Sequence, residues 1–117
     1  MREGLILVAH GSRDPEWSRP FARLAAALEK KLPAAAVALA YLEYGPSLEE
    51  AAAALLAKGA GSIRVVPVFL GAGGHVKEDI PRLVAAAKLS VPVIIDPPIG
   101  EQGGVIEAIA GEIAAPR

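Results

Sequence analysis

Two histidines and one glutamate stand where this chain could bind a metal ion. His10 directly follows an apolar segment, His75 follows a glycine-rich segment, and Glu43 ends a second apolar segment. Two neutral imidazoles and a carboxylate suit divalent ions such as Fe²⁺, Co²⁺, Ni²⁺ and Zn²⁺, and they leave coordination positions open for a further ligand. The alternative is that each histidine only makes a hydrogen bond within its own loop.

Polar and basic residues beside the histidines could hold a negatively charged ligand. Ser12 and Arg13 follow His10, and Lys77 follows His75. Guanidinium and ammonium groups bind carboxylates through charge-assisted hydrogen bonds. The alternative is that these side chains are ordinary solvated loop residues.

Gly73 and Gly74 precede His75 in a loop that also contains Gly71. Glycine lets a ligand approach the backbone closely, and the N-terminus of a following helix favours an anion. The other interpretation is a tight turn that requires positive φ angles, and on the loop sequence alone this second interpretation is favoured.

Composition and missing motifs exclude several classes of protein. The chain has no cysteine, which excludes disulfide scaffolds, thiolate metal sites and iron–sulfur clusters. Its formal net charge of −1 argues against a nucleic-acid partner. We find no Walker motif and no G-x-G-x-x-G fingerprint. Ser12 does not lie in a G-x-S-x-G elbow, so a hydrolase that uses Ser12 with His10 is disfavoured.

Four apolar segments have the length of β-strands and are separated by helical patterns. The predicted strands are 5–9, 36–42, 63–70 and 91–95. The predicted helices are 17–32, 48–58, 77–88 and 104–115. Ser47 and Glu50 form a capping-box pattern at the start of the second helix. The residues expected to face the core are Trp17, Phe21, Leu24, Leu28 and Leu32 in the first helix, Ile80, Leu83, Val84 and Ala87 in the third, and Val105, Ile106, Ile109 and Ile113 in the fourth.

The order βαβαβαβα predicts an α/β fold with a four-stranded parallel sheet in one domain, residues 1–117. Strands that are apolar on both faces need helices on both faces. The strand order 1-2-3-4 would place every helix on one face, whereas 2-1-3-4 covers both and creates a switch point between strands 1 and 3. This order brings His10, Glu43 and His75 to the same carboxyl edge, where ligands bind in open α/β sheets.

The apolar run near the N-terminus is too short for a signal peptide or a membrane span. We therefore expect a cytoplasmic protein with no membrane association.

Three segments carry a family resemblance: VAHGSRDP at 8–15, LEYGPSLEE at 42–50 and VPVFLGAGGHVKEDIP at 66–81. They resemble the short CbiX-type sirohydrochlorin chelatases, which are class II, ATP-independent enzymes. The two histidine motifs together make the resemblance specific. The pair Tyr44-Gly45 departs from the apolar pair more usual after the glutamate, and nothing is carried over after Asp96.

The resemblance implies insertion of a divalent metal into sirohydrochlorin, an octacarboxylate tetrapyrrole. Co²⁺ is the favoured metal and Fe²⁺ or Ni²⁺ are the alternatives, each as substrate, with no organic cofactor. The family's metal-binding and proton-accepting histidines correspond to His10 and His75, and its assisting glutamate corresponds to Glu43. Because long members contain two tandem halves around a cleft, the resemblance also implies that this chain forms a homodimer.

In the resulting hypothesis, Ser12, Arg13, Gly73, Gly74 and Lys77 bind the substrate carboxylates. The competing hypothesis is a metal carrier or tetrapyrrole-binding module that uses the same residues without catalysis.

Overall fold

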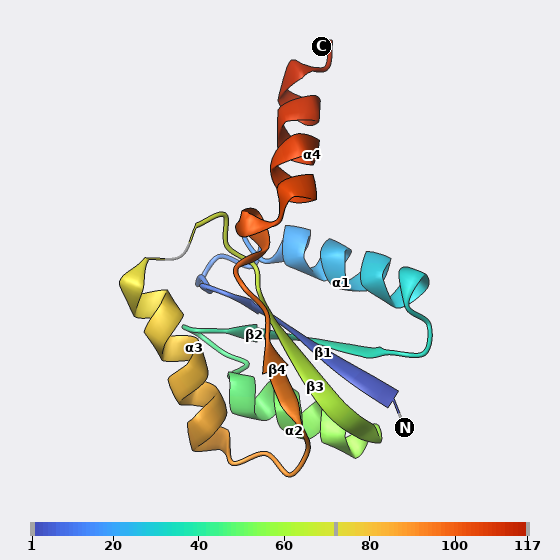
Figure 1. Cartoon of the computed structure of the whole chain (residues 1–117), viewed down its shortest axis with the longest axis vertical. Helices are drawn as coiled ribbons and strands as arrows, with labels where there is room; N and C mark the ends of the chain where they lie inside the picture. The colour runs from blue at the N-terminus through green and yellow to red at the C-terminus, as the bar shows by residue number, and fades with distance from the viewer. Residues whose placement is uncertain (1, 72, 117) are drawn as a thin grey trace.

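The computed structural model describes residues 2–71 and 73–116, and of His75 it describes only the backbone. The chain forms one four-stranded sheet in the order β2-β1-β3-β4, and all neighbouring strands are parallel (Figure 1). The predicted fold class and strand order are therefore confirmed. The elements are β1 (Arg2–Ala9), α1 (Arg19–Lys31), β2 (Ala36–Tyr41), α2 (Leu48–Ala57), β3 (Ala60–Pro67), α3 (Gly74–Ala87), β4 (Val93–Ile95), the 3-10 turn η1 (Ile99–Glu101) and α4 (Gly103–Ala114).

The central strand β1 is buried on both faces from Leu5 to Ala9, as its continuous apolar sequence predicts. β4 is shorter than expected and pairs with β3 over three residues. An ion pair between Arg64 of β3 and Asp96, 2.7 Å apart, joins the two strands at the end of β4. The Asp96 carboxylate raises the pKa of the Arg64 guanidinium, mainly through their hydrogen bond.

One face of the sheet is covered by α2 and α3. Ile6, Val8, Ile63 and Val65 point to this face and pack with the apolar residues of α2 and with Ile80 of α3. The predicted capping box is present, because the Ser47 hydroxyl accepts from the Glu50 N–H and the Glu50 carboxylate accepts from the Ser47 N–H. This cap fixes the start of α2, which therefore enters the core directly after β2.

The opposite face is covered by α1 alone. Trp17 and Phe21 lie 5.9 Å and 6.4 Å, between ring centroids, from Tyr41 of β2, so α1 lies over the β2 side. The first-helix stripe is only partly inward, since Leu24 and Leu32 are exposed. On the third helix Ile80 is buried as predicted, but Leu83 is exposed.

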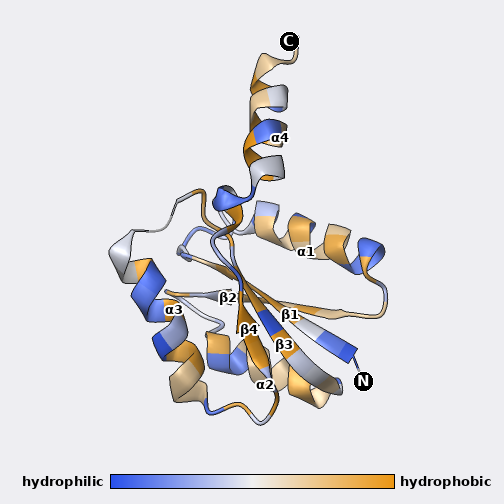
Figure 2. Ribbon diagram, viewed as in Figure 1, coloured by the Kyte–Doolittle hydropathy of each residue, from blue (hydrophilic) through white to orange (hydrophobic). Residues whose placement is uncertain are grey.

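The fourth helix does not pack on the sheet, and the prediction that its apolar residues face the core is wrong. α4 projects away from the body beyond the carboxyl edge of the strands (Figures 1 and 2). Ile106 is 53% exposed, Ile109 37% and Ile113 72%. No described residue of α4 is buried. Among the described residues, no helix is both long and apolar enough to cross a membrane.

Candidate functional site

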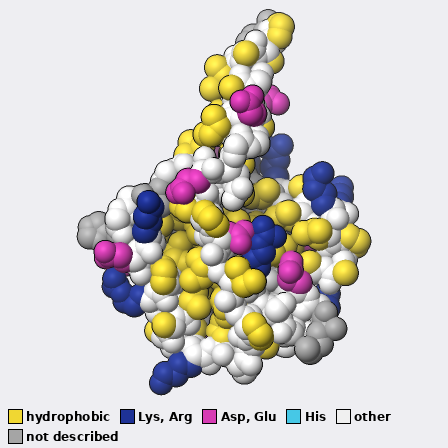
Figure 3. All heavy atoms as spheres, viewed as in Figure 1, with side chains coloured by type: hydrophobic (Ala, Val, Ile, Leu, Met, Phe, Trp, Pro, Cys, Tyr) yellow, Lys and Arg dark blue, Asp and Glu magenta, His cyan; other side chains and the backbone are white. Residues whose placement is uncertain are grey.

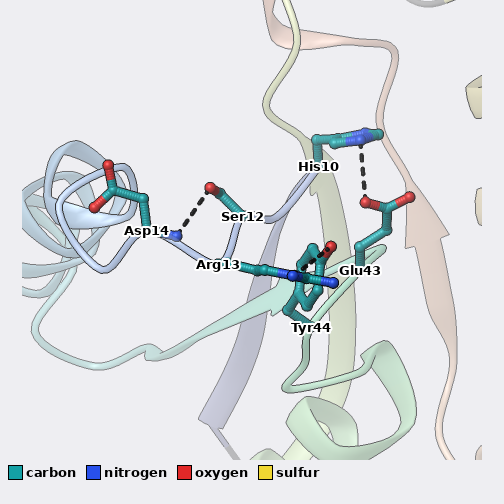
Figure 4. Close-up of polar contacts among 6 residues, drawn as sticks. All are labelled: His10, Ser12, Arg13, Asp14, Glu43 and Tyr44. Carbon is teal, nitrogen blue, oxygen red and sulfur yellow. Dashed lines mark hydrogen bonds and ion pairs between the residues drawn. The ribbon is translucent and has the colours of Figure 1, made fainter.

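Backbone hydrogen bonds that continue beyond β1 and β2 place His10 beside Glu43. The Leu42 N–H donates to the Ala9 carbonyl at 3.0 Å, and the Glu43 N–H donates to the His10 carbonyl at 2.9 Å. The His10 Nε2 atom lies 3.6 Å from a Glu43 carboxylate oxygen (Figure 4). The predicted proximity of these two residues at the carboxyl edge is present in the structure.

The geometry of the His10–Glu43 pair suits a shared metal ion. Ligand atoms 3.6 Å apart can both lie about 2.1 Å from one ion, the usual distance for nitrogen and oxygen ligands. The His10 and Glu43 side chains are 59% and 56% exposed, so an ion and a large substrate can reach both. The pair alone leaves most coordination positions open.

Gly11 makes the close approach of these two segments possible. Its φ is +103°, and a Cβ atom at this position would lie 2.1 Å from the Glu43 carbonyl oxygen. Any other residue would push the His10 segment away from Glu43. We did not predict this role from the sequence, although a glycine directly after the histidine is the visible signal.

His75 lies in the first turn of α3, at the end of the segment that follows β3. The helix begins at Gly74, three residues before the predicted start at Lys77, so His75 is helical rather than a loop residue. The Val68 N–H donates to the Val8 carbonyl at 2.8 Å and extends the β1–β3 pairing toward the same edge. The His75 side chain lies outside the described residues. Among the side chains that are described, no three metal-binding groups come together.

Gly73 and Gly74 do not form the tight turn that the loop sequence alone favoured. Gly73 is the N-cap of α3 with a φ of −67°, and Gly74 is the first helical residue. A Cβ atom at either position would meet nothing within 4 Å. This region is open, and the first N–H groups of α3 are available to a ligand at the helix N-terminus.

Ser12 is engaged in a local turn. Its hydroxyl accepts a hydrogen bond from the Asp14 N–H at 3.1 Å. The structure thus gives Ser12 a turn-forming role, and it adds no support for the disfavoured hydrolase.

Arg13 contacts Tyr44, a residue that we did not predict to be functional. The Arg13 Nε–H donates to the Tyr44 hydroxyl at 3.2 Å, and the guanidinium carbon lies 5.5 Å from the centre of the Tyr44 ring (Figure 4). Tyr44 has a φ of +65°, which is uncommon for a non-glycine residue, and its side chain is exposed. The only signal in the sequence is the departure at Tyr44-Gly45 from the apolar pair.

A cavity of about 160 Å³ lies between α3 and the ends of β3 and β4. Ile80 and Ile95 line its apolar part, and Lys77, Asp96 and Glu101 line its rim. Pockets that enclose a small-molecule ligand usually measure about 300–1,000 Å³. This cavity can therefore hold part of a large ligand at most.

The model of the CbiX family matches residues 4–115 of this chain. The sirohydrochlorin cobaltochelatase of Sulfolobus acidocaldarius is 35% identical over 112 residues, which cover 91% of this chain and 85% of that protein. The enzyme of the same name from Saccharolobus solfataricus is 44% identical over 82 residues, which cover 69% of this chain and 62% of that protein.

Among solved structures, the sirohydrochlorin chelatase SirB from Bacillus subtilis subspecies spizizenii, in complex with cobalt, has a TM-score of 0.82 and 28% identity. The match covers 97% of this chain but 50% of SirB. This chain thus spans about half the length of SirB and less than two thirds of the Saccharolobus protein.

Proposed function

Since the chain belongs to the CbiX family, we propose that it is a sirohydrochlorin chelatase, with Co²⁺ as the preferred metal substrate and Fe²⁺ or Ni²⁺ as alternatives. Two relatives named sirohydrochlorin cobaltochelatase and the cobalt-bound SirB structure support this choice. The observation that carries the proposal is the exposed His10–Glu43 pair, 3.6 Å apart at the carboxyl edge.

In the proposed reaction, one divalent ion replaces two pyrrole N–H protons of the macrocycle. Neutral His10 binds the incoming ion, and Glu43 orients the imidazole or joins it as a ligand. His75, from the start of α3, is the proposed second imidazole ligand. As the ion passes from the imidazoles to the pyrrole nitrogens, each imidazole nitrogen that releases it becomes free to accept one pyrrole proton. The two histidines are therefore the proposed acceptors of the two protons. The metal keeps its oxidation state, so the proposal requires no ATP and no organic cofactor.

The substrate carboxylates need cationic and N–H partners around this pair. Arg13 and Lys77 are the proposed cations, with Ser12 and the backbone N–H groups of Gly73 and Gly74 beside them. Arg13 lies next to the pair (Figure 4). Lys77, in the first turn of α3, lines the cavity.

A second copy of the chain would complete the substrate cleft. The cavity of about 160 Å³ cannot enclose a tetrapyrrole, and the site is otherwise open on one side. SirB has about twice the length that this chain matches. We therefore propose a homodimer of single-domain chains, with the cytoplasm as its compartment.

The test is an absorbance assay with sirohydrochlorin and Co²⁺, Fe²⁺ or Ni²⁺ in parallel. His10→Ala and His75→Ala should each lower the insertion rate about a hundredfold, since each removes a proton acceptor. Glu29→Gln on the exposed face of α1 is the matched control and should leave the rate unchanged.

Unchanged rates in both histidine variants would overturn the proposed mechanism. Tight retention of the metal without insertion into sirohydrochlorin would instead favour the non-catalytic carrier.

A further inference from the structure

The helix α4 carries an apolar stripe that the described part of its own chain leaves exposed. Ile106, Ile109 and Ile113 follow one another at spacings of three and four residues, which places them on one side of the helix. Ile106 and Ile113 are 53% and 72% exposed. A helix of 12 residues is marginal in water without tertiary packing. The stripe therefore needs a partner surface.

The sheet has a matching uncovered area. Val37, Leu5, Arg64 and Ile94 form one row across β2, β1, β3 and β4 on the face that α1 covers. Leu5 is 2% exposed, whereas Ile94 at the far end of the row is 67% exposed. Between them lies Arg64, which is exposed and has its charge paired with Asp96. The β3–β4 half of this face thus lacks the second helix that the fold would normally place there. Figure 3 shows hydrophobic side chains along the projecting helix and over the body below it.

The chain direction at η1 keeps α4 from reaching this area in its own molecule. The Gly100 N–H donates to the Phe69 carbonyl at 2.9 Å. Gly100 is packed so closely that a Cβ atom would lie 1.9 Å from the Leu70 carbonyl oxygen. Gly100 is the buried residue of this hydrogen-bonded turn, from which α4 runs outward beyond the carboxyl edge (Figure 1).

We propose that two copies of the chain exchange their α4 helices, so that the apolar stripe of each lies on the β3–β4 half of the other's sheet. Each chain has one helix without a surface and one surface without a helix, and a two-fold axis satisfies both at once. The inference rests on the proposed homodimer and specifies the surface that holds it together.

The first test introduces a charge on either side of the proposed contact. Ile113→Asp on α4 and Ile94→Lys on β4 should each raise the dimer dissociation constant about tenfold or more, because each buries an uncompensated charge in the contact. The new ammonium at position 94 would lie beside the Arg64 guanidinium of β3. Both positions are mostly exposed in the single chain, so circular dichroism should show an unchanged fold. Glu107→Lys, on the other side of α4, is the control and should leave the constant unchanged.

The second test uses the absence of cysteine from the native sequence. Protein carrying Ile94→Cys is mixed with protein carrying Ile106→Cys, Ile109→Cys or Ile113→Cys and is oxidised gently. The exchange predicts a disulfide-linked dimer of one chain of each kind for at least one mixture, seen on a non-reducing gel.

Several results would overturn the exchange. The first is a wild-type protein that stays monomeric in sedimentation at high concentration. The second is a dimer weakened by Ile113→Asp but not by Ile94→Lys, and the third is a dimer in which none of the mixtures crosslinks. Loss of chelatase activity is a separate result: a crosslinked dimer that inserts no metal would retain the exchange and overturn the proposed function.

Discussion

The contact between the His10 and Glu43 segments depends on the residue between His10 and Ser12. Gly11 has a φ of +103° and lies directly against the Glu43 carbonyl. Gly59 also has a positive φ, +87°, but its missing Cβ would meet nothing within 4 Å. A substitution at Gly59 therefore costs backbone strain alone, whereas the same substitution at Gly11 costs backbone strain and a steric clash.

Gly11→Ala should lower the free energy of unfolding by about 3 kcal/mol or more, since it adds a clash to the strain. Gly59→Ala, as the matched control, should cost about 1–2 kcal/mol from the strain alone. Urea unfolding monitored by circular dichroism measures both. Equal losses in the two variants would contradict the proposed packing of Gly11 on Glu43.

Tyr44→Phe should raise the KM for sirohydrochlorin about two- to fivefold and leave kcat unchanged, because the phenol positions Arg13 without touching the metal. Thermal unfolding should not change, since Tyr44 is exposed. Initial rates at varied substrate concentration provide the measurement. A lower kcat with an unchanged KM would show that Tyr44 acts otherwise.

The proximity of His10 and Glu43 could be predicted because both directly follow strands whose order is set by general rules of chain connection. The contact of Arg13 with Tyr44 could not be predicted, because it depends on the unusual backbone angle at Tyr44. The role of His75 as a ligand remains a prediction.

At the scale of elements, the capping box of α2 has a measurable pH dependence. Two groups of Ser47 hold the pKa of Glu50 below the ordinary value of 4.5: its backbone N–H has the larger effect and its hydroxyl the smaller. A depressed carboxyl pKa stabilises the folded state above the unfolded pKa, and this contribution is lost as the pH falls through the folded pKa.

The wild-type Tm should therefore fall more than that of Glu50→Gln when the pH is lowered from about 6 to about 3. Glu49→Gln is the control, because Glu49 lies in the same turn but outside the capping box. Differential scanning calorimetry across this range measures the difference. Parallel Tm curves for wild type and Glu50→Gln would contradict a role of the cap in stability.

The sequence predicted the bounds of an element best where residues close together in the chain mark its beginning and its end. Ser47 and Glu50 mark the start of α2, and Lys58 is its C-cap. The packing of α4 was not predictable, since an apolar stripe shows that a helix needs a surface but not which surface. Its direction depends on the contact of Gly100 with Leu70, which lies far away in the sequence.

The whole molecule is less compact than a typical domain of the same length. Its radius of gyration is 14.6 Å, whereas a compact domain of this length has a radius of about 13 Å. The difference fits the projecting α4 helix (Figure 1). A chain with this shape and this much exposed isoleucine should associate with a second copy.

The proposed dimer predicts that the Tm of the wild-type protein rises by a few degrees when the protein concentration is raised about a hundredfold, because association stabilises the folded state. Ile113→Asp should require a protein concentration about tenfold higher or more to reach the same rise in Tm, because it weakens the association. Scanning calorimetry over a dilution series is the measurement. A wild-type Tm that does not change on dilution would contradict the association.

The hydrogen bonds that continue from β1 and β2 into His10 and Glu43 are made by main-chain atoms alone. The Cα positions at 10 and 43 therefore do not depend on the side chains there, provided that residue 43 keeps its backbone N–H. Replacing either residue exchanges one donor atom while the frame that presents it stays in place. A substitution at either position can thus change the chemistry presented at the carboxyl edge without rebuilding the fold.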